Sequence, residues 1–348
     1  MDKYRLRRDL IEHVGGFTLY RIEALKDFSD VKKGDLGGWI DDDLRLSQSG
    51  DSWVYNNAKV YNYARVSGNA KIYDNVTVCN CALVYDNAKI RDNALLEGQV
   101  QVFEEAEVSN NAKITDYAVI RERAKIYGNA TIKGYAKVYG NAEVYEYANI
   151  SGNAQIYDNA IIYGFTNIFD NAKIYNEAEV YDFATVRENA EVFGMAEIHD
   201  DVDIYESAHI SDMADIFDEA EVYGYATIDG CAKIHDFVKI CGSAIVSDKA
   251  EICDNAIIYG NAHIIGDAVI GDDKDYYVCK CIWSNCAELT YTHSNNMWCY
   301  EGVNYTGKEL VKKMSEESES DGQYCESMVE YIESLYKKIE ENNNTSKN

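Results

Sequence analysis

The feature that most constrains this chain is an aliphatic residue at every sixth position from Val54 to Ile270, without a single exception. The series has 37 members, and no residue is inserted or deleted between the first and the last. Four positions after each aliphatic stands a small residue, which is Ala at 31 of the 36 places. Two positions after each aliphatic, only Gly, Asp, Asn or Glu occurs. A period of six excludes an α-helix or a coiled coil, whose periods are about 3.6 and 3.5 residues.

The six-residue unit is explained by a very short strand followed by a corner. Around Val138, alternation places the aliphatic inside and its two neighbours outside, and the following Gly140 and Asn141 turn the chain. Three units close a triangular coil of about 18 residues, which places residue i beneath residue i+18. One coil cannot bury its own aliphatic side chains, so the coils must stack. The sequence therefore predicts an all-β fold, a single-stranded parallel β-helix of about 12 coils. The Ala residues four positions after each aliphatic keep the interior of this helix narrow.

An aliphatic at the first place and a small residue at the fifth is the pattern of the hexapeptide-repeat β-helices, and the chain resembles that class. The resemblance implies a left-handed helix; the class includes acyltransferases, γ-class carbonic anhydrases and non-catalytic scaffolds. Residues 1 to about 270 also resemble the YdcK-like proteins of bacteria and their phages, which are classed as acyltransferases without an established substrate. The segments that carry this second resemblance are Leu19–Ile22, Ala24–Phe28, Gly34–Ile40 and Trp53–Tyr55.

The period divides the chain into four segments. We expect an N-terminal cap over residues 1–53, the β-helix over 54–273, a small α+β module over 274–341 and a disordered tail over 342–348. In the module, apolar runs predict strands at Tyr276–Ile282, Glu288–Thr292 and Met297–Tyr300. Thr306 begins a capping box that opens a helix to about Met314. A second helix is predicted over Asp321–Glu340, with an apolar face formed by Tyr324, Met328, Ile332, Leu335 and Ile339.

The net charge of −27 is concentrated in one part of the β-helix. Residues 171–275 hold 24 acidic and 6 basic residues, whereas residues 54–170 hold 13 and 11. Direct binding of nucleic acid through phosphates is disfavoured by this balance. We find neither a signal-peptide pattern nor an apolar run long enough to cross a membrane. Ten Cys without a CxxC pair indicate reduced thiols and a cytoplasmic protein.

Folding the sequence into coils of 18 places six aspartates at one corner of successive coils. Stacked carboxylates repel and should raise one another's pKa. Solvated Asx turns explain such a column without any ligand. The alternative is a divalent cation, with the oxygens suiting calcium and the neighbouring imidazoles of His199 and His235 suiting a softer metal. The six residues are Asp182, Asp200, Asp218, Asp236, Asp254 and Asp272.

Outward aromatic residues form columns as well. The stacking of like aromatics stabilises a sheet, and such a column also offers a binding platform for a flat ligand or a face for self-association. A trimer, common among hexapeptide-repeat proteins, would place such a column at a subunit interface. The column proposed as a binding face consists of Tyr127, Tyr145, Tyr163 and Tyr181, and a second one of Tyr139, Tyr157, Tyr175 and Phe193.

Catalytic signals are weak. Acyl transfer needs a general base beside a groove that holds acetyl-CoA, and the base candidates are His199 and His235. The uninterrupted period leaves no loop of the kind that hexapeptide acyltransferases use to build this groove. A zinc knuckle from Cys279, Cys281, Cys286, His293 and Cys299 has unusual spacings, so buried free thiols are favoured there.

The sequence thus favours a non-catalytic, acidic β-helix that acts as a scaffold or binds a protein partner, and the second resemblance admits a phage origin. One alternative is an acetyl-CoA-dependent acetyltransferase, as that resemblance implies. Another is a DNA mimic, because an acidic rod with regularly spaced carboxylates imitates a phosphate backbone and can inhibit a DNA-binding protein.

Overall fold

The computed structural model describes residues 2–280 and 288–346. The chain is a β-solenoid of about 13 turns of about 18 residues, where the pattern predicts about 12, followed by a small module of strands and helices. It divides into two compact units, Met1–Asp200 and Asp201–Asn348. Among the described residues, no helix is both long and apolar enough to cross a membrane.

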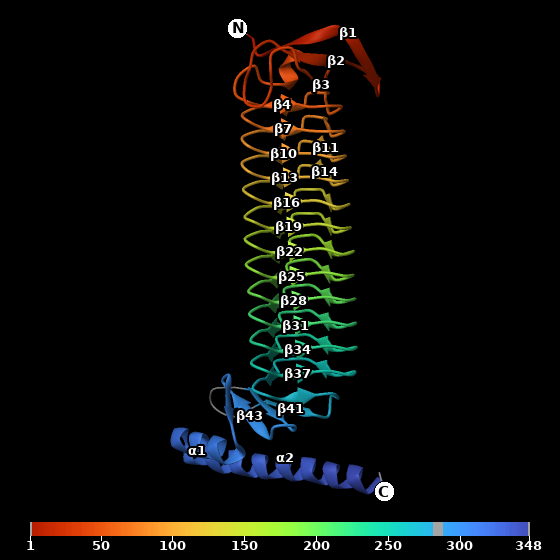
Figure 1. Cartoon of the computed structure of the whole chain (residues 1–348). Helices are drawn as coiled ribbons and strands as arrows, with labels where there is room; N and C mark the ends of the chain where they lie inside the picture. Colours follow the sequence, from red (N-terminus) through yellow and green to blue (C-terminus); the bar gives the residue numbers. More distant parts are fainter. Residues whose placement is uncertain (1, 281–287, 347–348) are drawn as a thin grey trace. The chain divides into compact units, whose positions relative to one another are not determined.

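In the first unit the coil strands form three parallel ladders whose neighbours lie 18 residues apart, as the stacked strands β4, β7, β10 and β13 show in Figure 1. Val138 pairs with Ile156, so the predicted register is confirmed.

The first ladder contains β4 (Trp53–Val54), β7 (Lys71–Ile72), β10 (Lys89–Ile90), β13 (Glu107–Val108), β16 (Lys125–Ile126), β19 (Glu143–Val144), β22 (Ile161–Ile162), β25 (Glu179–Val180) and β28 (Glu197–Ile198). The second contains β5 (Lys59–Val60), β8 (Thr77–Cys79), β11 (Leu95–Gly98), β14 (Lys113–Asp116), β17 (Thr131–Ile132), β20 (Asn149–Ile150), β23 (Asn167–Ile168) and β26 (Thr185–Val186). The third contains β6 (Arg65–Val66), β9 (Leu83–Val84), β12 (Gln101–Val102), β15 (Val119–Ile120), β18 (Lys137–Val138), β21 (Gln155–Ile156), β24 (Lys173–Ile174) and β27 (Glu191–Val192).

The coils of the second unit repeat this arrangement with the same register, for example Ile210 opposite Ile228. Its first ladder contains β31 (Asp215–Ile216), β34 (Lys233–Ile234), β37 (Glu251–Ile252) and β40 (Val269–Ile270). The second contains β29 (Asp203–Ile204), β32 (Glu221–Val222), β35 (Lys239–Ile240) and β38 (Ile257–Ile258). The third contains β30 (His209–Ile210), β33 (Thr227–Ile228), β36 (Ile245–Val246) and β39 (His263–Ile264).

The interior follows the sequence pattern closely. All 37 aliphatic residues of the period are buried, with at most 1% of their surface exposed. The small residues between them are buried too, and Thr166, which replaces one Ala, keeps a buried hydroxyl without a hydrogen-bond partner. Within each unit the aliphatic residues of successive coils pair in register, so each core is a column rather than a cluster.

The first unit begins with a cap that joins the coil ladder. Strands β1 (Tyr4–Val14) and β2 (Phe17–Ala24) are antiparallel, and β3 (Leu36–Ile40) pairs with β2 and, in parallel, with β5. A short 3-10 helix, η1 (Asp43–Arg45), follows. The aromatic that closes the core is Trp53, which meets the edges of Tyr4 and Phe28. Trp39 instead lies at an outward, half-buried position, because it pairs with the outward Lys59.

The second unit ends with a four-stranded antiparallel sheet and two helices. The predicted first strand is described only to Lys280, since 281–287 lie outside the described residues, and a fourth strand is added. The second helix runs to Ser346, so residues 342–346 are helical where a disordered tail is expected. Its buried face matches the prediction in part: Ile332 is buried and Met328 packs against the core, but Cys325, Val329 and Tyr336 complete the face in place of the other predicted residues. The elements are β41 (Tyr276–Lys280), β42 (Glu288–Thr292), β43 (Met297–Tyr300), β44 (Val303–Tyr305), α1 (Gly307–Glu317) and α2 (Glu319–Ser346).

This module contacts the last coils through side chains. The Thr290 hydroxyl accepts the His263 N–H, and the Ser294 hydroxyl accepts the Val269 N–H, both at 2.8 Å. The Asn304 amide donates to the Ile265 carbonyl at 3.1 Å. These bonds satisfy backbone groups at the end of the coil ladders, where no further coil follows.

Candidate functional site

The corners explain why only Gly, Asp, Asn or Glu occupies the second place after each aliphatic. At 36 of these 37 corners φ is positive, between 49° and 98°. Asp and Asn tolerate this left-handed conformation better than other residues with a side chain. In addition, corner side chains accept the backbone N–H of the corner one coil further on. Glu104, for example, accepts the Glu122 N–H at 2.7 Å, and Glu122 accepts the Gly140 N–H at 2.9 Å.

The same bonds hold the predicted Asp column in place. In the second unit, Asp218 accepts the Asp236 N–H at 3.1 Å, and Asp236 accepts the Asp254 N–H at 3.0 Å. In the first unit, Asp182 and Asp200 occupy the same type of left-handed corner. Asp272 departs from the column, because its φ is not positive and its N–H donates to Asp275 at 3.0 Å. Its position after the last coil explains the difference, since the period ends there.

The expected rise in the pKa of the stacked aspartates is wrong for Asp236. The backbone N–H of Asp254 and the imidazole of His235 hold the pKa of Asp236 below its usual value. A hydrogen bond from Asp273 and the backbone N–H of Lys274 likewise lower the pKa of Asp272. Hydrogen bonds to the ionised carboxylate therefore outweigh its desolvation at these two residues.

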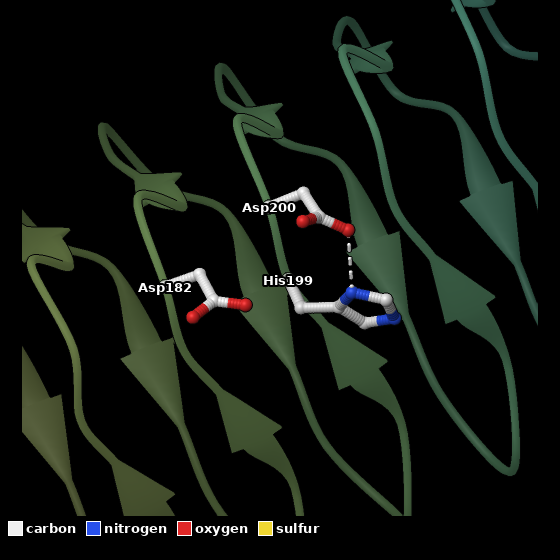
Figure 2. A group of neighbouring side chains, drawn as sticks. All are labelled: Asp182, His199 and Asp200. Carbon is white, nitrogen blue, oxygen red and sulfur yellow. Dashed lines mark hydrogen bonds and ion pairs between the residues drawn. The ribbon is translucent and has the colours of Figure 1, made fainter.

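Two clusters bring a histidine together with the aspartate column. In the first, Asp182, His199 and Asp200 each offer a ligand atom, and these atoms all lie within 4.8 Å of one another. His199 Nδ1 lies 2.8 Å from Asp200 Oδ2, and Figure 2 shows the imidazole edge turned toward this carboxylate, with Asp182 beside it on the neighbouring coil. The side chain of His199 is about 20% exposed.

The second cluster repeats this geometry in the second unit with Asp218, His235 and Asp236. His235 Nδ1 lies 2.8 Å from Asp236 Oδ2, and its Nε2 lies 3.2 Å from Glu251 Oε1. Sequence reasoning placed the histidines beside the corner but did not foresee these bonds. The signal for them is a His at i+17 and a second Asp at i+18 after an Asp, which occurs at both places.

The aromatic columns are stacked as expected. The rings of Tyr127, Tyr145, Tyr163 and Tyr181 follow one another at centroid distances of 4.7, 5.0 and 4.9 Å. The imidazole of His199 continues this stack, 4.8 Å beyond Tyr181 and within 7° of parallel. In the second column, Tyr139, Tyr157, Tyr175 and Phe193 stack at 4.9, 4.8 and 4.9 Å. Whether either column binds a ligand or a second copy stays a prediction.

Sequence reasoning favours buried free thiols over a zinc knuckle in the C-terminal module, and the structure describes three of the five residues concerned, Cys279, His293 and Cys299. Cys281 and Cys286 lie outside the part of the chain that the structure describes. Cys299 is a buried free thiol, and burial raises its pKa to about 11, which disfavours the thiolate that zinc requires. The Cys279 thiol contacts Met328, with 3.2 Å between the two sulfur atoms.

Comparisons with known proteins point to one family. The profile described as "YdcK Beta solenoid repeat" matches residues 154–164. The protein described as "Uncharacterized acetyltransferase YdcK" from Escherichia coli (strain K12) is 44% identical over 50 residues, which cover 14% of this chain and 15% of the relative. The match thus spans a small share of the relative's length. Together with the 18-residue coils and their left-handed corners, these matches show that the chain is similar to YdcK-like β-solenoid repeat proteins.

Proposed function

We propose that this protein is a non-catalytic scaffold that binds a basic protein partner through the acidic coils of residues 171–275. The observation that carries the proposal is the imbalance of charge on a regular surface. In the second unit's coils and the five residues after them, 201–275, 17 acidic residues stand against 4 basic ones. Charge of one sign on a rigid surface attracts an oppositely charged partner and raises its rate of association.

The regular placement of this charge supports the same proposal. Asp218 accepts a hydrogen bond from the Asp236 N–H, and Asp236 accepts one from the Asp254 N–H. These bonds fix the carboxylates on a rigid backbone. A partner therefore meets charges whose positions need not be ordered on binding, and this lowers the entropic cost of association.

A substitution of the six column aspartates by Asn tests the proposal. Asn preserves the corner, because Asn110 and Asn176 already accept the N–H of Gly128 and Gly194 from left-handed corners. The matched control replaces six left-handed corner aspartates of the charge-balanced coils by Asn: Asp74, Asp86, Asp92, Asp116, Asp158 and Asp170.

Partners would be captured from lysate with the intact chain, identified by mass spectrometry, and their binding repeated with purified proteins over a range of salt. We expect the column variant to lose most of the binding and the control variant to retain it, with affinity falling as salt rises. Equal binding by both variants, or affinity independent of salt, contradicts the proposal. If the partner binds DNA and DNA competes with the scaffold, the proposal narrows to DNA mimicry.

The second candidate is an acetyl-CoA-dependent acetyltransferase, which is favoured by the similarity to a relative described as an acetyltransferase. His199 and His235 each have a carboxylate at Nδ1, the arrangement that orients a general base. Against this, His235 also contacts Glu251 through Nε2, the nitrogen that would have to take the substrate proton. Both histidines lie on uninterrupted faces of the coils.

Acetyl-CoA binding and turnover by the intact chain separate the two candidates. The scaffold predicts no saturable binding. Saturable binding or acetyl transfer that is lost in a His199→Asn, His235→Asn double variant, and kept in His209→Asn, would make the acetyltransferase the better assignment. Sedimentation of the same samples tests for the trimer, which a groove between subunits would require.

A further inference from the structure

We propose that the clusters Asp182–His199–Asp200 and Asp218–His235–Asp236 are two equivalent sites for a divalent transition-metal ion such as Zn²⁺. This inference is independent of the proposed function. Each cluster offers one imidazole nitrogen and two carboxylates, with ligand atoms within 4.8 Å of one another. Imidazole together with carboxylate suits zinc and its neighbours in the first transition series, whereas calcium takes oxygen ligands alone.

The observed spacing of the donor atoms fits such an ion. With Zn–N and Zn–O distances of roughly 2.0–2.2 Å, two ligand atoms of a tetrahedral site lie about 3.4 Å apart. The Nδ1 atom lies 2.8 Å from the Oδ2 atom of the adjacent Asp in both clusters. All ligand atoms of a cluster lie within 4.8 Å of one another, so small side-chain rotations bring them to the tetrahedral separation.

Each imidazole is held in place before any ion binds. His199 is stacked on Tyr181 at 4.8 Å, and His235 on Phe217 at 5.0 Å, with ring planes within 10° of parallel. The stacking fixes the plane of each ring and the Nδ1 contact fixes its rotation, so both nitrogens are oriented at little entropic cost on binding. The aromatic residues of the preceding coil thus orient the imidazoles independently of the acidic groups at the corner.

The electrostatic environment favours a cation. The Asp236 carboxylate accepts a hydrogen bond from the Asp254 N–H at 3.0 Å, which fixes its position at the corner. The Asp218–His235–Asp236 cluster lies in residues 201–275, which hold 17 acidic and 4 basic residues. A bound divalent ion would offset repulsion between successive corners of the column.

The chain supplies its own matched control. His209 is an exposed coil histidine whose Nδ1 contacts the carbonyl of Ser207 at 2.8 Å, and it belongs to neither cluster. The variants are therefore His199→Asn, His235→Asn, the double variant and His209→Asn. All three side chains point out of the coils, so the buried aliphatic column is untouched.

The test is a calorimetric titration of the intact chain, thiols kept reduced, with Zn²⁺ and separately with Co²⁺. We expect two ions per chain in the wild type and in His209→Asn, one in each single variant, and none at these sites in the double variant. The Co²⁺ absorption spectrum should lack the charge-transfer band of thiolate ligands, which distinguishes these sites from the cysteines.

Three outcomes would overturn the assignment. The first is a double variant that binds as many ions as the wild type. The second is a Co²⁺ spectrum dominated by thiolate ligation. The third is binding of Ca²⁺ with the same stoichiometry in wild type and double variant, because that would indicate a site made by carboxylates alone. Replacing Asp182 and Asp218 by Asn should weaken Zn²⁺ binding at least tenfold, whereas replacing the corner residue Asp158 should leave it unchanged.

Discussion

The coils of residues 54–200 and those of residues 201–275 have interiors built from the same pattern but differ in how their carboxylates are stabilised. In the first region, Glu143 accepts hydrogen bonds from Lys125 at 2.7 Å and from Tyr127 at 3.0 Å, and these partners lower its pKa. In the second region, burial and the neighbouring carboxylates Asp212 and Asp248 raise the pKa of Asp229. The first region holds 20 acidic and 13 basic residues, the second 17 and 4.

This contrast shows that the fold leaves surface charge free to vary. The inward positions and corners obey one rule in both regions, because burial and the left-handed turn demand it. The outward positions carry Lys–Glu pairs such as Lys125–Glu143 in one region and an excess of acid in the other. A repeat protein can therefore acquire a charged binding surface without any change of its core.

The largest expected effect tests whether the two interiors are equivalent. Ile150 and Ile240 belong to equivalent strands, β20 and β35, and both are fully buried. Changing either to Ala should lower the free energy of opening of the surrounding coils by roughly 2–5 kcal/mol, since a cavity replaces the same packed side chain. Hydrogen exchange of the neighbouring amides measures it, which avoids assuming two-state unfolding for a repeat array. A cost at Ile240 far below that at Ile150 would show that the two interiors are not equivalent.

Much of this interior is predictable from the sequence, for a physical reason. A strict period allows one residue to be aligned with the residue 18 further on, and burial then follows from side-chain type. The pairing of Val138 with Ile156 and the stacking of Tyr145 on Tyr163 both came from that alignment. The alignment also placed His199 and His235 beside the aspartate column.

What the sequence did not predict depends on atoms that a period does not specify. The hydrogen bond that the Asp254 N–H donates to Asp236 depends on the rotamer of the Asp236 side chain. This bond lowers the pKa of Asp236, whereas the neighbouring charges alone predict a rise. The buried face of α2 was assigned only in part, because two apolar stripes have helical spacing and both contain Ile332. Packing against the sheet selected the one with Cys325 and Tyr336, whose hydroxyl donates to the Tyr276 carbonyl, and left Leu335 40% exposed. Such a choice needs the partner surface, which lies far away in the sequence.

A pair of charge-neutralising substitutions should change stability in opposite directions in the two regions. Glu143→Gln removes the ion pair with Lys125 and should lower the free energy of opening by a few tenths to about 1 kcal/mol. Asp229→Asn removes a half-buried charge that faces Asp212 and Asp248, and should raise it by a similar amount. Hydrogen exchange of the amides around each residue measures both. Two effects of the same sign would contradict the contrast between the regions.

Acidification should also affect the two regions differently. The folded-state pKa of Glu143 is lowered, so its contribution to stability is present above the unfolded pKa of about 4.3 and is lost as pH falls through the folded value. The folded-state pKa of Asp229 is raised, so the folded chain binds the proton first and repulsion is relieved as pH falls through that value.

The measurement is the pH dependence of the melting temperature between pH 7 and pH 3, compared between the wild type and each variant. At pH 7 the wild type should melt at a higher temperature than Glu143→Gln, and this difference should shrink as pH falls. At pH 7 the wild type should melt at a lower temperature than Asp229→Asn, and this difference should also shrink as pH falls. Parallel curves for either pair would show that the carboxyl in question does not titrate differently in the folded and unfolded states.

The smallest expected effect is that of salt. At an ionic strength of about 0.1 M the screening length is roughly 10 Å, and at 1 M it is about 3 Å, so salt weakens attraction and repulsion at exposed positions alike. Raising NaCl over this range should slightly destabilise the coils around Lys125 and Glu143 and slightly stabilise those around Asp229, by a few tenths of a kcal/mol each. Hydrogen exchange at two salt concentrations resolves the regions within one sample, and KCl in place of NaCl excludes a specific effect of Na⁺. A uniform change in both regions would mean that salt acts on the shared apolar core, as excluded salts do, and that the charge contrast contributes little to stability.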